Sequence, residues 1–198
     1  MALLEALLNL LFPRRCVLCH KEGSWLCATC TPVGVSEFWQ LEDGTEAQSL
    51  FSFDEPAVRE LLHYLKYNGV YEAGELLVGL GAAVLPRDAV LIPVPTSQER
   101  LKQRGYNQAE VIARALGLPV WPALRKRHAT SQVGKGGAER RAREQEFVWA
   151  EVAGGFAGRP WVVVDDICTT GSTLRRCLEA LKPFATSGIS ALVVARVG

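Results

Sequence analysis

The chain has 198 residues and a net charge of +1; 48% of its residues are hydrophobic and 22% are charged. This length and composition predict a soluble globular protein with one main core and room for a small appendage. The near-zero net charge gives no general attraction to polyanions, and no apolar run reaches the roughly 18–20 residues of a membrane-spanning helix. Nothing in the sequence marks the chain as secreted, so we expect a cytoplasmic protein.

The N-terminal segment is rich in leucine. Its leucines fall on one face of a helix that Pro13 ends: Leu3, Leu4, Leu7, Leu8 and Leu11. The segment lacks the positive start and the small-residue cleavage site of a signal peptide. We expect this N-terminal helix to pack against the core, with docking to a partner or peripheral contact with a membrane as the alternatives.

Four of the six cysteines follow the pattern C-x₂-C-x₇-C-x₂-C: Cys16, Cys19, Cys27 and Cys30. Two such pairs bring four thiolates together as tetrahedral Zn²⁺ requires. Because four protein ligands leave no open position for chemistry, we expect a structural zinc. The alternatives are an iron–sulfur cluster and two disulfides. Disulfides are the less favoured interpretation, because nothing marks the chain as secreted. The pattern predicts a division into residues 1–45, with the N-terminal helix and this knuckle, and residues 46–198, the main domain.

Beyond the cysteines, strand and helix patterns alternate along the chain. Apolar runs predict strands at residues 48–53, 89–94, 161–164 and 191–195. Amphipathic patterns predict helices at residues 55–67, 72–84 and 99–116, and another helix after Gly171. Alternation of this kind is typical of α/β proteins with parallel strands.

Two segments are rich in cationic and amide side chains. The first follows the strand at 89–94 and places donors near its end that suit the charge of a diphosphate: Lys102, Arg104, Asn107 and Gln108. Gly105 disfavours the alternative of an ordinary solvated helix start, because glycine costs about 1 kcal/mol inside a helix. The second segment, residues 125–143, carries seven basic residues against one acid and is rich in glycine. It predicts either a basic lid over a phosphate-rich ligand or a strip that contacts nucleic acid.

Residues 161–173 carry the most specific signal. The strand ends in Asp165 and Asp166, and a turn rich in hydroxyl groups follows: Thr169, Thr170, Gly171, Ser172 and Thr173. Such a turn before a helix favours a phosphate, while the carboxylates suit ribose hydroxyls or a Mg²⁺ ion shared with phosphate. These parts predict a ribose 5-phosphate site; the alternative is an exposed acid pair ahead of an ordinary helix cap. With the strand–helix alternation, they predict a doubly wound α/β fold with a mostly parallel sheet.

The same segment resembles the signature of type I phosphoribosyltransferases that binds phosphoribosyl diphosphate (PRPP), apolar-Asp-Asp-x-x-Thr-Thr-Gly-x-Thr. Motifs along nearly the whole chain resemble those of the ComF family: Cys16–Cys30, Leu65–Gly69, Pro93–Pro95, Arg104–Ala109, Thr130–Gln132 and Val164–Thr173. The resemblance implies a type I phosphoribosyltransferase fold behind a zinc finger, with PRPP and Mg²⁺ as ligands. It also implies that Lys66 faces the site, and it links the chain to DNA uptake in natural transformation or to the use of external DNA.

Two functions stay open at this level. The first is an enzyme that transfers ribose 5-phosphate from PRPP to a nitrogen nucleophile. Its catalytic residues would be Asp165 and Asp166 on the ribose, with the Thr169–Thr173 turn on the 5′-phosphate and Arg104 with the basic segment on the diphosphate. The second is a non-enzymatic protein that uses the same fold and the knuckle to hold the phosphates of single-stranded DNA, together with DNA-uptake proteins.

Overall fold

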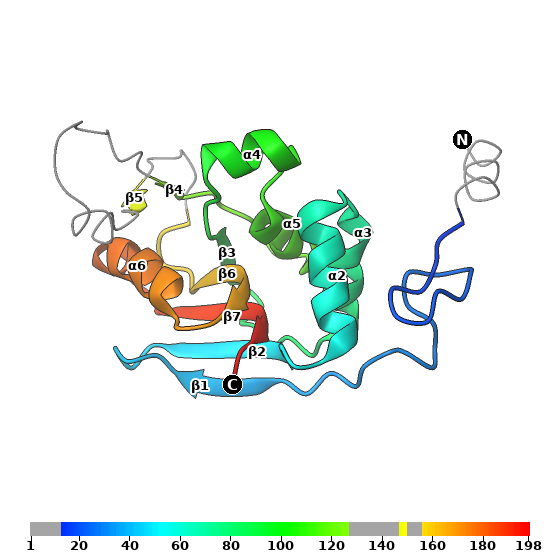
Figure 1. Ribbon diagram of the computed structural model, residues 1–198. Coiled ribbons are helices and arrows are strands. Elements are labelled where there is room, and N and C mark those ends of the chain that lie inside the picture. The colour runs from blue at the N-terminus through cyan, green and yellow to red at the C-terminus, as the bar shows by residue number, and fades with distance from the viewer. Residues whose placement is uncertain (1–12, 127–146, 150–155) are drawn as a thin grey trace, which may run out of the picture.

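The computed structural model describes residues 13–126, 147–149 and 156–198 (Figure 1). The predicted N-terminal helix and most of the basic segment at 125–143 lie outside these residues. Among the helices that the structure describes, none combines the length and the apolar composition needed to span a bilayer.

A five-stranded sheet forms the centre of the molecule, in the order β1-β2-β7-β6-β3. The strands span Glu37–Gln40 (β1), Glu46–Ser52 (β2), Val90–Pro93 (β3), Trp161–Cys168 (β6) and Ile189–Arg196 (β7). The strands β2, β7, β6 and β3 are parallel, and only the edge strand β1 runs antiparallel to its neighbour. A separate short hairpin joins β4 (Leu124–Lys126) to β5 (Phe147–Trp149).

Helices cover both faces of the sheet (Figure 1). Because side chains alternate along a strand, Val162 and Val164 of β6 face one apolar cluster, while Trp161 and Val163 face the other. The first cluster is completed by α2 (Pro56–Tyr67), α3 (Tyr71–Leu80) and α5 (Gln108–Ala115). The second is completed by α6 (Ser172–Leu181), which the short turn η1 (Lys182–Phe184) follows. This arrangement confirms the predicted doubly wound fold.

The predicted single helix at 99–116 is wrong. The structure has two helices there, α4 (Gln98–Arg104) and α5, separated by a turn. Gly105 ends α4 with a φ of +81°, a left-handed conformation that glycine adopts without strain. Asn107 then caps α5, since its side-chain oxygen accepts a hydrogen bond from the backbone N–H of Ala109 at 3.2 Å. The chain therefore changes direction between Arg104 and Gln108.

Two further details differ from the sequence pattern. Strand β6 continues four residues beyond the apolar run that ends at Val164, so Asp165 and Asp166 belong to the strand and not to the turn. Strand β1 has no counterpart among the predicted strands and pairs with β2 over its whole length. The predicted domain boundary at residues 45–46 therefore falls at the end of the β1–β2 turn, with β1 on the knuckle side.

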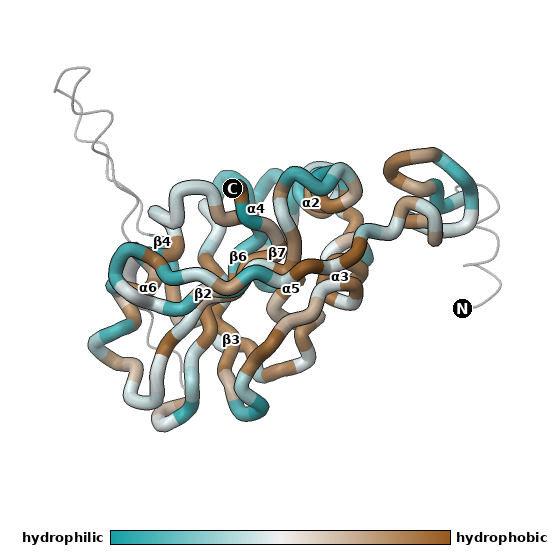
Figure 2. The backbone as a smooth tube through the Cα atoms, turned by 90° about the horizontal axis from the view of Figure 1, so that it is seen from below, coloured by the Kyte–Doolittle hydropathy of each residue, from teal (hydrophilic) through white to brown (hydrophobic). Residues whose placement is uncertain are grey.

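The knuckle, which we define as residues 13–34, lies beside α2 and α3 (Figures 1 and 2). Cys16, Val17 and Leu26 are buried in the same apolar cluster as α2. An exposed ion pair joins Arg14 to Glu72 in the first turn of α3, with the atoms 3.1 Å apart. The knuckle is thus packed onto the helical layer and shares its core.

Candidate functional site

A cavity of about 400 Å³ opens at the carboxyl ends of β3 and β6. From β3 the chain continues into α4 and α5 on one face of the sheet, whereas from β6 it continues into α6 on the other face. Adjacent parallel strands whose connections leave in opposite directions create a crevice between them, and ligands of open α/β sheets bind there. The volume lies within the range of small-molecule sites.

The acid pair forms one wall of this cavity. Asp165 and Asp166 are both buried, and the Asp165 carboxylate accepts a hydrogen bond from the backbone N–H of Asp166 at 2.9 Å. Burial, together with the neighbouring charge of Asp166, raises the pKa of Asp165 to about 8. Asp166 forms an ion pair with Lys66, whose Nζ lies 3.0 Å from its Oδ2. The cavity wall therefore holds two neighbouring buried carboxyl groups beside one ammonium group.

Four cationic side chains also line the cavity. They come from three elements and are Lys66 of α2, Arg100 and Arg104 of α4, and Lys126 of β4. Arg104 is held in place, because it donates a hydrogen bond to Gln108 at 3.0 Å and its guanidinium lies 5.1 Å from the centre of the Tyr67 ring. Burial and the nearby charge of Arg100 lower the pKa of Lys126. The cavity thus combines four cationic side chains with one pair of carboxyl groups.

The hydroxyl-rich turn closes the end of the cavity nearest α6. Thr169 and Thr173 line the cavity, whereas Thr170 and Gly171 line a smaller cavity of about 150 Å³ on the β1 side of the turn. Gly171 has a φ of +72° at the start of α6. A Cβ there would lie 3.1 Å from a methyl group of Leu41, so a side chain is disfavoured by both conformation and space. The turn therefore presents hydroxyls and helix N–H groups to an anion.

The structure brings most of the sequence-predicted site residues together. Those that line the main cavity are Lys66, Arg104, Gln108, Asp165, Asp166, Thr169 and Thr173. Ser172 is the first residue of α6 and does not line the cavity. Asn107 lies elsewhere: besides capping α5, it donates a hydrogen bond to the carbonyl of Val94 at 2.9 Å. Its amide therefore holds the turn after β3, and Asn107 is not among the residues that line the cavity.

Sequence reasoning did not single out two polar lining residues, Arg100 and Thr96, and it included a third, Lys126, only as part of the predicted basic segment. Arg100 lies one helical turn before Arg104, a spacing that puts both on one face of α4. Lys126 stands at the start of the basic segment, and its position in β4 was not predicted. Thr96 gave no signal in the sequence; its hydroxyl is buried and has no hydrogen-bond partner within the described part of the chain. A buried, unpaired hydroxyl on a cavity wall is suited to a ligand.

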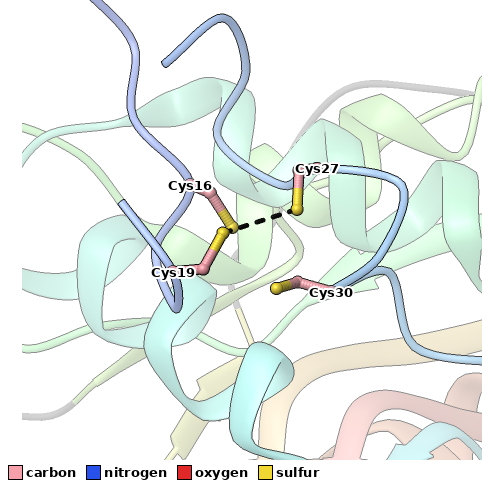
Figure 3. A group of neighbouring side chains, drawn as sticks. All are labelled: Cys16, Cys19, Cys27 and Cys30. Atoms are coloured by element: carbon pink, nitrogen blue, oxygen red, sulfur yellow. Dashed lines mark hydrogen bonds between the residues drawn. The ribbon is translucent and has the colours of Figure 1, made fainter. Parts of the chain in front are cut away.

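The four N-terminal cysteines form a second site (Figure 3). Their sulfur atoms all lie within 4.8 Å of one another, and those of Cys19 and Cys27 are 3.6 Å apart. A tetrahedron with Zn–S distances of about 2.3 Å has sulfur–sulfur separations of about 3.8 Å. Burial acts to raise the pKa of the Cys16 thiol, but backbone N–H groups around it lower that pKa to about 6. The donor set and its spacing fit a tetrahedral metal ion.

Comparison with known proteins assigns the family. The model of the phosphoribosyl transferase domain matches residues 101–198, which contain the second half of α4, and α5, β6, the hydroxyl-rich turn and β7. The chain is 24% identical over 185 residues to Competence protein ComFC of Streptococcus pneumoniae, a match covering 91% of this chain and 80% of that protein. The chain belongs to the ComF family. The residues that match the phosphoribosyl transferase domain include the acid pair and the hydroxyl-rich turn, both of which line the cavity at β3 and β6.

Other relatives match over shorter stretches. Competence protein ComFC of Bacillus subtilis is 35% identical over 92 residues, covering 45% of this chain and 38% of that protein. Competence protein F of Haemophilus influenzae is 34% identical over 113 residues, covering 54% and 49%. A solved purine phosphoribosyltransferase from Pyrococcus horikoshii aligns with 65% of this chain and 81% of its own, at 17% identity and a TM-score of 0.31.

Proposed function

We propose that the cavity binds PRPP together with Mg²⁺. The observation that carries this proposal is the buried acid pair, which lines a single cavity together with the cationic side chains of Arg100, Arg104 and Lys126. PRPP has two free ribose hydroxyls between a 5′-phosphate and a 1-diphosphate, so it offers hydrogen-bond donors at its centre and negative charge at both ends. The cavity has the complementary order of groups.

Each part of PRPP has a matching part of the cavity. The hydroxyls of the ribose would donate to Asp165 and Asp166. The 5′-phosphate would lie in the Thr169–Thr173 turn, against the N-terminus of α6. The diphosphate would then extend toward α4 and β4, where it meets the cationic side chains and the buried hydroxyl of Thr96.

The acid pair favours PRPP over single-stranded DNA as the ligand of this cavity. A ribose with free 2′- and 3′-hydroxyls donates to carboxylates, but DNA lacks the 2′-hydroxyl and its 3′-oxygen is esterified within the strand. A phosphodiester placed against Asp166 would bring two negative charges together at a buried position, which is costly. Binding of DNA by this protein is therefore expected to use surfaces outside the acid pair.

The residues present also fit Mg²⁺. Carboxylate oxygens are its preferred protein ligands, and it is usually held by one or two carboxylates and the phosphates of the substrate. Asp166 offers a buried oxygen that accepts no well-oriented hydrogen bond from the described residues, although it is paired with Lys66. A bound Mg²⁺ would supply positive charge that offsets the charge of the diphosphate.

A transfer reaction at this site would exchange one bond at C1 of the ribose. The bond from C1 to the diphosphate oxygen breaks and its electron pair leaves with the diphosphate, while a bond forms from C1 to a nitrogen atom of the acceptor. The acceptor nitrogen gives up a proton in the same process. Arg100, Arg104 and Lys126 would stabilise the charge that grows on the leaving diphosphate.

We further propose a role in the uptake of DNA from outside the cell. The support is that three relatives are named competence proteins. A cytoplasmic location is part of this proposal and is supported by the six cysteines, all of which are free in the described structure. For the knuckle, we propose a structural zinc, supported by the four converging sulfur atoms.

Calorimetric titration tests the proposal for the cavity. Wild-type protein should bind PRPP with Mg²⁺, and Asp166→Asn should lose most of this affinity. Asp54→Asn, at an exposed position after β2, is the matched control and should bind like wild type. The proposal is refuted if wild-type protein fails to bind PRPP while a single-stranded oligonucleotide binds with a steep dependence on salt. Release of pyrophosphate when one nucleobase is added to the PRPP complex would establish transfer.

A further inference from the structure

The knuckle touches α2 at the end of that helix that reaches the cavity. Trp25 lies between the two cysteine pairs, two residues before Cys27. Its ring packs edge-on against the ring of Tyr64, with the centroids 5.7 Å apart and the planes at 60°. Tyr64 is in the last turn of α2, which ends at Tyr67. The contact therefore joins the cysteine site to the helix turn that supplies Lys66 and Tyr67 to the cavity.

The last turn of α2 is held between the knuckle and the cavity. A helix turns about 100° per residue, so Lys66 projects from the side of α2 almost opposite to Tyr64. On that side, Lys66 pairs with Asp166 at 3.0 Å. Tyr67, three residues after Tyr64 and therefore closer to its side of the helix, lies under the guanidinium of Arg104. A contact that displaces Tyr64 would therefore also displace Lys66 relative to the acid pair.

The backbone at Tyr64 also fixes the end of the helix. The carbonyl oxygen of Tyr64 accepts hydrogen bonds from the backbone N–H groups of Asn68 at 3.0 Å and of Val70 at 3.4 Å. These two bonds close the final turn and the Asn68-Gly69 bend after it. A displacement of Tyr64 would therefore move Lys66 and Tyr67 together with the turn.

We propose that Trp25 is a positioning residue for the cavity, acting through Tyr64 on Lys66. By packing on Tyr64, the metal-loaded knuckle sets the last turn of α2 so that Lys66 meets Asp166. The inference rests on the proposed binding of PRPP in the cavity. It makes metal at the four cysteines and PRPP in the cavity cooperative ligands, since each favours the same position of the helix end. Cooperativity of this kind is reciprocal: the factor by which zinc strengthens PRPP binding is the factor by which PRPP strengthens zinc binding.

The test uses full-length, zinc-loaded protein and PRPP with Mg²⁺ in calorimetry. Trp25→Leu should keep its zinc and weaken PRPP binding by about fivefold or more, the lower range of measured couplings between sites. The matched control is Arg14→Gln, which removes the knuckle's ion pair with α3, a helix that lines no part of the cavity. This control should bind PRPP like wild type.

A double-mutant cycle distinguishes positioning from general destabilisation. If Trp25 acts through Lys66, then Trp25→Leu should cost little additional affinity in a Lys66→Met background, because the side chain it positions is already gone. The inference is overturned if Trp25→Leu binds PRPP with wild-type affinity. It is equally overturned if the two effects multiply in full.

Hydrogen exchange gives a readout that does not depend on PRPP. The amides of Asn68 and Val70 should exchange several-fold faster in zinc-loaded Trp25→Leu than in wild type, while amides of β6 keep their protection. Failure of wild-type protein to bind PRPP would refute the proposed function and leave this comparison standing. Unchanged exchange at both amides would refute the positioning role while leaving PRPP binding intact.

Discussion

Replacing Asp165 by asparagine should remove a large part of the pH dependence of the protein's stability. The side chain is buried at the carboxyl end of β6, where burial and the charge of Asp166 raise its pKa from 3.8 to about 8. Asparagine has nearly the same shape and keeps an oxygen that accepts the hydrogen bond from the backbone N–H of residue 166. The substitution therefore removes the titration while preserving the contact.

The sign and the size follow from proton linkage. Between pH 4 and pH 8 the folded protein holds a proton on Asp165 that the unfolded chain has released, so folding stability falls as the pH rises through this window. Each pH unit contributes about 1.4 kcal/mol. From pH 5 to pH 7, wild-type protein should lose about 3 kcal/mol through this group, a large share of the 5–15 kcal/mol that stabilises a typical domain.

Urea unfolding at pH 5, 6 and 7 measures the effect. Because groups away from the acid pair titrate equally in both proteins, the relevant quantity is the free energy of unfolding of Asp165→Asn minus that of wild type. This difference should grow by about 3 kcal/mol between pH 5 and pH 7 in favour of the variant. A difference that stays constant over this range would show that Asp165 is already ionised in the folded protein, and the charge assignment of the acid pair would be wrong.

Three further predictions concern Gly171, Asn107 and the four N-terminal cysteines. Gly171→Ala should lower the free energy of unfolding by about 1–2 kcal/mol through the left-handed conformation alone. Crowding should lower it further, because a methyl group of Leu41 in the β1–β2 turn lies only 3.1 Å from the new Cβ. Gly117→Ala, at nearly the same φ but in open space, gives the first contribution by itself in the same urea assay. Asn107→Ala should lower the free energy of unfolding by about 1–2 kcal/mol, because α5 loses its cap. It should also weaken PRPP binding, because the turn at Val94 on the cavity wall loses its hydrogen bond. Binding of PRPP with wild-type affinity would contradict the second expectation. Elemental analysis should find about one zinc per chain of wild-type protein. The zinc should be lost in Cys27→Ser and retained in Cys168→Ser, because Cys168 is buried in the main domain. Folded wild-type protein without metal would contradict the zinc assignment.

The local signals in the sequence predicted the fold well. The apolar run before Asp165 and the leucines after Gly171 mark a buried strand and an amphipathic helix, and both are present. Such patterns depend on the periodicity of one segment and on nothing else in the chain. The single helix predicted at 99–116 was wrong for a related reason: helical periodicity continues across the Gly105 turn, and periodicity alone does not show that the chain changes direction there.

The site was harder to predict where it depends on contacts between distant segments. Asn107 was predicted to bind ligand because it stands beside Arg104 and Gln108, but the helix that starts at Gln108 turns its amide toward Val94. Lys126 lines the cavity because of its place in β4, whose partner strand begins twenty-one residues later. Residue type and spacing identify groups that suit phosphate; they do not show which of them share a cavity.

If the cavity binds PRPP as proposed, the acid pair is the part of it that distinguishes PRPP from other phosphates. Cations and helix N–H groups attract any phosphate, so they favour PRPP, a nucleotide and a DNA strand alike. Asp165 and Asp166 add a requirement for hydroxyl donors between the two charged ends of the ligand. Because both side chains are buried beside Lys66, a ligand without hydroxyl donors would leave a buried carboxylate without hydrogen bonds, which lowers its affinity. For this reason Asp166→Asn should narrow the preference for PRPP over a ribose-free ligand such as inorganic pyrophosphate. Competition between these two ligands in calorimetry measures that preference, and an unchanged ratio of affinities would remove the acid pair from ligand recognition.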